Sequence, residues 1–227
     1  MSSSGYFFPG LFGAFAVSVA VSVFVPASQL SSLGPSFKEE DGLISDVYPN
    51  APAGLAAVGK QVYVSEGCQT CHSQFVRGLE SADIDRGWGA RRTVARDYVS
   101  EAMPVLGTFR LGPDLANVGN NSWRNEPAED SSKPAKRDAA WQFHHLYNPT
   151  AVVRETTMPA YRHLFQDRKI TGAPSPDALQ LPGDLQPEPG HEIVPTPAAK
   201  ALVAYLSSLD RSHTLKEAGK AAAVAAK

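Results

Sequence analysis

The chain has 227 residues, of which 43% are hydrophobic, and its formal net charge is −2 at pH 7. That length allows one large or two small domains. The chain has no surplus of basic residues of the kind that nucleic-acid-binding proteins carry, so we expect no nucleic-acid partner.

The amino-terminal end of the chain is free of charged residues until Lys38. Within it, Tyr6–Val25 is dominated by Phe, Val, Ala and Leu, and as a helix it would be about 30 Å long, which matches the hydrocarbon core of a bilayer. A removable signal sequence, cut near Val25-Pro26-Ala27, and a helix of a soluble core are the alternatives. We favour a retained membrane anchor at residues 1–27, because no basic residue precedes the apolar run and the run is long for a signal.

After the anchor, residues 28–50 are polar and contain several prolines and glycines, which predicts a linker. Helical periodicity begins near Pro52 and continues to the next motif. Gly59 and Tyr63 lie on one face of this predicted helix, one turn apart.

The next motif, Cys68-Gln69-Thr70-Cys71-His72, contains both cysteines of the chain. Two thiols at this spacing can each add to a vinyl group of one haem, and the adjacent histidine then binds the iron. A redox disulfide would leave His72 unexplained, and a zinc site would need further ligands. The motif therefore predicts one covalently bound haem c, and because such haem is attached outside the cytoplasm, a periplasmic domain.

A short turn, Gly112-Pro113-Asp114-Leu115, is similar to the G-P-x-L turn of cytochromes c. In that turn the proline carbonyl accepts a hydrogen bond from the second nitrogen of the axial histidine, which fixes the ring. We therefore expect Gly112, Pro113 and Leu115 to belong to the cofactor site. Arg110, just before the turn, is the candidate partner for the haem propionates, with a solvated surface arginine as the alternative.

The second axial ligand is predicted to be Met158, because the distal methionine of cytochromes c follows the G-P-x-L turn in the chain and Met103 precedes it. Met158 comes after a helical segment through Trp141 and Leu146. Met103, His144 and His145 are the alternatives.

The last predicted helix begins at Thr196 and Pro197, a typical cap and first-turn pair. We expect it to cross the first helix of the domain, with Gly59 allowing close approach and Tyr205 filling the crossing, although two unrelated amphipathic helices would show the same periodicity. Residues 120–137 and 167–195 are expected to be irregular surface segments, and residues 216–227 a frayed helix or a disordered end.

Together these elements predict a mainly α protein: one amino-terminal transmembrane helix, then a cytochrome c-like haem domain with long irregular insertions. We place the haem domain at residues 51–212 and an Ala/Lys-rich tail at 213–227.

From Tyr63 to Tyr161 the chain resembles the membrane-anchored monohaem subunit of cbb3-type cytochrome c oxidases, the FixO/CcoO family. The matching stretches are YVSEGCQTCHSQFVR, GTFRLGPDLANVG, HLYNPTAVV and MPAY. Phe75 and Gly78 depart from the family, which usually has Met and Pro there.

The resemblance implies thioethers at Cys68 and Cys71 and iron ligation by His72 and Met158. It also implies a subunit that is not catalytic alone and passes electrons to a haem-copper oxidase subunit, in a complex with other cytochrome c subunits at the bacterial inner membrane. The monohaem subunit of nitric oxide reductase and a free-standing, membrane-tethered cytochrome c shuttle are the alternatives. A haem-based sensor would need an open sixth position, against which Met158 argues.

Overall fold

A computed structural model describes residues 4–40, 43–78, 82–120 and 137–219. The chain forms two compact units, one of residues 1–50 with 95–102, the other of residues 51–94 with 103–227. Most of the segment predicted to be irregular at 120–137, and the end of the chain from residue 220, lie outside the described residues.

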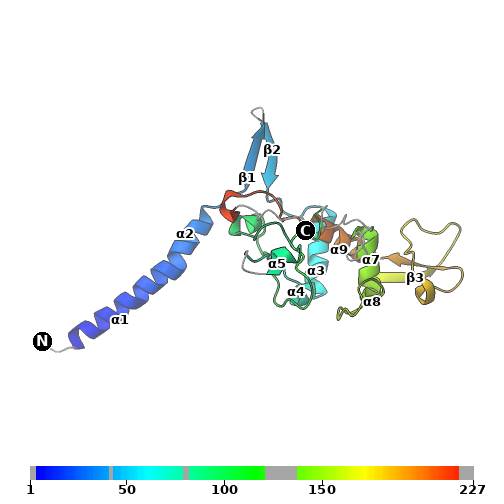
Figure 1. The fold of residues 1–227 in the computed structure, drawn as a ribbon, viewed down its shortest axis with the longest axis horizontal. Coiled ribbons are helices and arrows are strands. Elements are labelled where there is room, and N and C mark those ends of the chain that lie inside the picture. The colour runs from blue at the N-terminus through cyan, green and yellow to red at the C-terminus, as the bar shows by residue number, and fades with distance from the viewer. Residues whose placement is uncertain (1–3, 41–42, 79–81, 121–136, 220–227) are drawn as a thin grey trace. The chain divides into compact units, whose positions relative to one another are not determined.

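The first unit begins with a long apolar helix, built from α1 (Ser4–Val19), a π-helical turn η1 (Ala20–Phe24) and α2 (Val25–Ser31) (Figure 1). The most apolar window of 18 residues within Gly5–Ser31 has a mean hydropathy of 2.1, and none of it is buried. Phe12 and Phe24 are 76% and 68% exposed, which is unlike a helix of a soluble core. The length and composition of this helix are consistent with a membrane anchor.

The predicted linker contains a β-hairpin, which the sequence did not suggest. Strands β1 (Ser36–Glu40) and β2 (Leu43–Tyr48) pair antiparallel, with a register shift between Lys38 and Glu39. The 3-10 helix η2 (Ala95–Tyr98) belongs to the same unit: the Tyr48 hydroxyl donates to Asp97 at 2.6 Å, and Arg96 donates to the carbonyl of Gly34.

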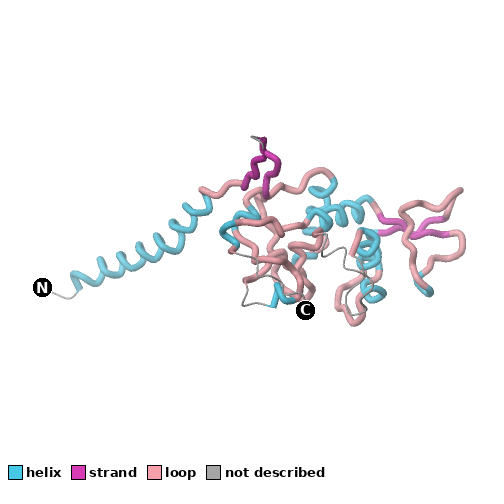
Figure 2. Tube along the Cα trace, turned by 45° about the horizontal axis from the view of Figure 1, so that its top comes forward, coloured by secondary structure: helices cyan, strands magenta, loops and turns pink. Residues whose placement is uncertain are grey.

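The second unit is helical with long loops (Figure 2). Its first helix begins at Leu55, a turn later than the sequence predicts, because Gly54 has a positive φ of 55° and delays the helical backbone. Its helices are α3 (Leu55–Ser65), α4 (Cys68–Cys71), α5 (Ala82–Asp85), α7 (Ala139–Tyr147), α8 (Pro149–Val152), η3 (Arg162–Leu164), η4 (Gly183–Leu185), α9 (Pro197–Ser208) and η5 (Lys216–Ala218).

The expected crossing of the first and last helices of this unit is present, between α3 and α9 (Figure 1). A Cβ on Gly59 would lie 1.8 Å from the Ala201 carbonyl oxygen, so only glycine permits this approach. The rings of Tyr63 and Tyr205 meet edge to face, with centroids 5.4 Å apart. The side chain of Thr196 caps α9 by accepting from the amide of Ala199.

The proline-rich segment 167–195 is not wholly irregular. Strands β3 (Phe165–Lys169) and β4 (His191–Pro195) form an antiparallel ribbon, with Phe165 opposite Pro195 and Lys169 opposite His191. Ile193 joins Phe165 in the hydrophobic core. Phe165 also meets the rings of Phe143 and Tyr147, which attaches the ribbon to α7.

The helix crossing can be tested by substituting Gly59. Gly59→Ala should lower the free energy of unfolding by about 3 kcal/mol, the upper end of the usual cost of overpacking, because the new methyl group meets backbone and not a flexible side chain. Denaturant unfolding followed by circular dichroism measures this. Gly78→Ala is the control, since a Cβ there would meet only the Arg92 side chain at 3.8 Å. Equal stability of the two variants would contradict the close crossing.

Candidate haem-binding site

The two cysteines are the first and last residues of the short helix α4, which follows α3 after a turn at Gly67. Gly67, with a φ of 73°, ends the first helix and starts the second, so that Cys68 turns inward and is 8% exposed. Both thiols are unpaired. Burial raises the pKa of the Cys68 thiol to about 11, so this thiol is protonated at neutral pH.

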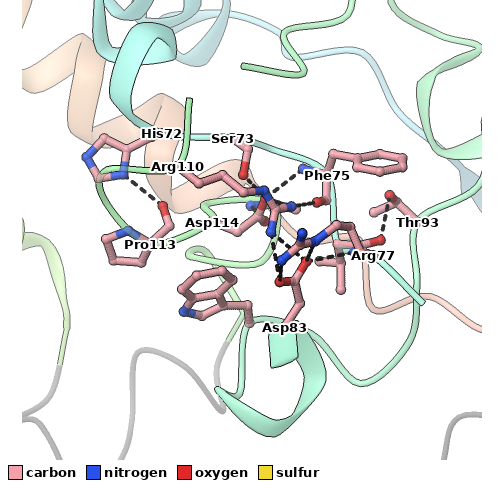
Figure 3. Close-up of polar contacts among 12 residues, drawn as sticks. His72, Ser73, Phe75, Arg77, Asp83, Thr93, Arg110, Pro113 and Asp114 are labelled. Carbon is pink, nitrogen blue, oxygen red and sulfur yellow. Dashed lines mark hydrogen bonds and ion pairs between the residues drawn. The ribbon is translucent and has the colours of Figure 1, made fainter. Parts of the chain in front are cut away.

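His72 leaves α4 in an extended conformation and is fixed by the predicted turn (Figure 3). Its Nδ1 lies 2.8 Å from the Pro113 carbonyl oxygen. Because a carbonyl only accepts, Nδ1 carries the proton and donates, which leaves the lone pair of Nε2 for a metal. Burial lowers the pKa of His72, which favours the neutral ligand form.

Gly112 allows this contact, because a Cβ there would lie 2.3 Å from Cε1 of His72. The segment that carries the turn runs beside the cysteine motif through backbone hydrogen bonds: the amides of Thr108, Phe109 and Gly112 donate to the carbonyls of Gln69, Thr70 and Cys71. The motif and the turn therefore form one continuous wall.

A cavity of about 350 Å³ opens beside this wall, a size common for cofactor sites. His72 and Met158 both line it, and so do both cysteines and three residues of the predicted turn: Gly112, Pro113 and Leu115. Most of its other lining side chains are apolar, among them Leu111, Val118, Leu146, Val153, Leu202 and Leu206.

Met158 reaches the cavity because its segment is attached to α7. The amide of Tyr161 donates to the carbonyl of Leu146 at 2.8 Å, and the amide of Met158 donates to the Thr156 hydroxyl. Met103, in contrast, is 80% exposed and does not line the cavity. Of the four residues considered for the second axial position, Met158 and His145 lie at the cavity.

His145 was only an alternative ligand from the sequence, but the structure places it in the cavity wall. Its ring stacks on Trp141, with centroids 4.6 Å apart. Its Nδ1 is buried and has no hydrogen-bond partner among the described residues. Burial, with the nearby His72 and Arg137, lowers the pKa of His145 to about 4, so the imidazole is neutral at pH 7.

The residues present fit a covalently bound haem. Two unpaired thiols, an oriented imidazole and a thioether border one apolar cavity, and each is a group that binds haem c. The buried, unpartnered nitrogen of His145 is also expected where a polar group of a cofactor completes the site.

Arg110 is not brought to the cavity. Its guanidinium donates to Asp83 at 2.7 and 2.8 Å and to the carbonyl of Phe75, and it lies over the ring of Trp88 (Figure 3). Arg110 therefore braces the loop behind His72, and the structure shows no contact that supports its predicted role toward the propionates.

Asp83 and Asp114 are the two buried carboxylates of this brace, and sequence analysis missed both. Asp83 accepts from the amide, Nε and Nη2 of Arg77 as well as from Arg110. Asp114 accepts from the Ser73 hydroxyl at 2.6 Å and from the amide of Phe75 at 2.7 Å. The position of Asp114 inside the conspicuous turn was the one signal that could have identified it.

The family comparison agrees with this geometry. The model of the family described as cytochrome c oxidase, mono-heme subunit/FixO matches residues 13–180, which is more than half of the chain. The comparison with curated proteins found no match. The fold and the site define a haem protein with an apolar amino-terminal helix. The chain belongs to the FixO family, the mono-haem subunit of cytochrome c oxidase.

The buried Asp83 gives a testable pH dependence. Burial alone would raise the pKa of Asp83, but the hydrogen bonds from Arg77 and Arg110 outweigh it and hold the pKa below its usual value. A depressed carboxyl pKa stabilises the fold above the unfolded-state pKa, near 3.8, and this contribution disappears as the pH falls below that value.

Asp83→Asn should therefore lower the free energy of unfolding by about 3 kcal/mol at pH 7, since it leaves two guanidinium groups without their carboxylate. The difference from the wild type should shrink as the pH falls below about 4. Urea unfolding at several pH values measures both. Asp85→Asn, on an exposed neighbour in α5, should cost less than about 0.5 kcal/mol. A cost at Asp83 that does not change with pH would refute the ion-pair explanation.

Proposed function

We propose that this chain is the monohaem electron-transfer subunit of a cbb3-type cytochrome c oxidase. It relays electrons through one covalently bound haem c to a separate haem-copper subunit that reduces dioxygen, and it works beside other cytochrome c subunits of that complex. The observation that carries this proposal is that Cys68, Cys71, His72 and Met158 line one apolar cavity, in a chain of the FixO family.

Each side chain of the cavity has a defined task in this proposal. Cys68 and Cys71 would form thioethers to the cofactor, and His72, whose Nδ1 is bound to the Pro113 carbonyl, would offer Nε2 to the iron. Met158 would supply its thioether sulfur as the second ligand, and the surrounding aliphatic side chains would exclude water. When bound, the haem supplies a one-electron couple, whose potential a thioether ligand raises relative to a second imidazole.

The same residues favour a relay over an oxygen-reducing site. With His72 and Met158 as ligands, the chain leaves no iron position for dioxygen. A haem-copper centre needs several histidines within a transmembrane bundle, whereas the first histidine of this chain is His72, after the apolar helix. Oxygen reduction therefore belongs to the partner subunit.

The apolar helix anchors the subunit in the bacterial inner membrane by a single pass, with the haem domain in the periplasm, where haem c is attached. Tethering keeps the domain near its partner and raises the effective concentration of each for the other. The soluble domain therefore does not need the tight contacts with its partner that a freely diffusing cytochrome c would need.

Purification of the full-length chain in detergent tests this function. We expect co-purification of a multi-span haem-copper subunit, oxygen uptake by the complex, and a c-type haem that stays on this chain in a denaturing gel. The isolated chain should accept electrons from small mediators without sustained oxygen uptake. The Cys68→Ala, Cys71→Ala double variant is the matched control and should lose the stain. Nitric oxide consumption by the complex, or purification without any partner, would contradict the proposal.

The second axial ligand is tested by substitution at Met158. Met158→His should keep the iron six-coordinate but lower the reduction potential, because imidazole stabilises ferric iron more than a thioether does. Met103→Leu, at an exposed position, should leave both the potential and the far-red sulfur-to-iron band unchanged. The assignment is reversed if that band persists without Met158 and disappears without Met103.

A further inference from the structure

Two side chains of α7 and one residue just before this helix follow one another at intervals of four residues: Trp141 and His145, preceded by Arg137. The spacing places Trp141 and His145 on one side of the helix, and a contact with the Trp141 ring adds Arg137 to the same row. The Arg137 guanidinium carbon lies 5.3 Å from the centroid of the Trp141 ring. The His145 ring also stacks on Trp141, with the two ring centroids 4.6 Å apart. All three line the cavity, so the row faces the cofactor site.

The position of the cysteines fixes which edge of a haem reaches this row. Tyr161 is hydrogen-bonded through its amide to Leu146, near the carboxyl end of α7, and its side chain lies beside the Cys68 thiol. Cys68 is therefore near the carboxyl end of α7, whereas Arg137 precedes its amino end. In haem c the propionates leave the porphyrin on the side opposite the thioethers. A haem attached at Cys68 thus directs its propionates toward Arg137.

We propose that Arg137 and His145, with Trp141 packed between them, form the carboxylate-binding site for the haem propionates. This inference rests on the proposed function, because it presupposes the haem. Arg137 provides a cation whose planar group matches a carboxylate. His145 provides a buried ring nitrogen that has no hydrogen-bond partner among the residues that the structure describes.

The electrostatic setting explains why a cation is needed here. The amino end of α7 favours an anion through its free amides, but the Asp138 carboxylate already caps it by accepting from the Trp141 amide at 3.0 Å. Two propionates would add negative charge beside Asp138, and Arg137 offsets that charge. Arg110 cannot take this part from its observed position, since its guanidinium is bound to Asp83 and Phe75 outside the cavity.

The test compares Arg137→Gln with Arg162→Gln in the full-length, haem-containing protein. Arg162 makes the same kind of ring contact, over Tyr147 at 5.4 Å, but does not line the cavity. Loss of a positive charge near the iron favours the ferric form. At an effective dielectric constant of about 20, Arg137→Gln should shift the one-electron equilibrium about tenfold, which lowers the reduction potential by about 59 mV. Arg162→Gln should leave the potential unchanged.

Resonance Raman spectroscopy gives a second readout, because the propionate-bending band responds to hydrogen bonding. Arg137→Lys keeps the charge but loses the planar fork, so it should shift this band while the potential stays near that of the wild type. His145→Phe keeps the stack on Trp141 and removes the ring nitrogens, so it should also shift the band and retain a low-spin spectrum. If Arg137→Gln does not incorporate haem, the propionate-bending band of Arg137→Lys tests the proposal in its place.

The proposal is overturned if the potential of Arg137→Gln equals that of the wild type, or if the band is unchanged in Arg137→Lys and His145→Phe. Loss of the low-spin spectrum in His145→Phe would instead make His145 an iron ligand and also overturn it. A wild-type chain without covalent haem would refute the proposed function itself. Retained haem with unaffected variants refutes only the propionate site.

Discussion

The close approach of α3 to α9 at Gly59 determines where the cysteine motif lies. Because Gly59 has no side chain, the backbone of α9 at Ala201 packs directly on α3, and Tyr63, one turn later, meets Tyr205. The end of α3 is thereby fixed against the core, and Cys68 follows it after a single short turn. A wider crossing would move the thiols away from Leu202 and Leu206, the α9 residues that line the cavity.

The same crossing extends to the residues after His72. The buried amide of Gln74 donates to the Tyr205 hydroxyl at 3.0 Å, and Ser73 and Phe75 are bound to Asp114. At Phe75 these contacts use the backbone, while its ring is 41% exposed. This explains why Phe can stand here where the family usually has Met: the bracing contacts do not depend on the side chain. A Cβ at Gly78 would likewise meet little.

Local and periodic features of the fold could be predicted from the sequence, and contacts between distant residues could not. The caps and apolar spacing predicted α9, and the crossing at Gly59 and Tyr205 is confirmed. Chain order favoured Met158 over Met103, and only Met158 lies at the cavity.

The sequence analysis missed the β1–β2 hairpin and the β3–β4 ribbon. Prolines and charged residues obscured these short strands, which are stabilised by their pairing. The position of Arg110 was also missed. Its partner Asp83 is 27 residues away and is buried only because two arginines pair with it, a constraint that no local pattern records.

The hydrogen-bond acceptor of the His72 ring affects the reduction potential that a haem bound there would have. A carboxylate that accepts from the axial imidazole makes it more basic and stabilises ferric iron, whereas a neutral carbonyl does so less. Asp114 is next to Pro113 and could supply such a carboxylate, but its oxygens are held by the Ser73 hydroxyl and the amides of Phe75 and Ala116. His72 therefore donates to the Pro113 carbonyl. Combined with the proposed thioether ligand from Met158, this arrangement would disfavour a low reduction potential, as the proposed transfer of electrons to an oxidising partner subunit requires.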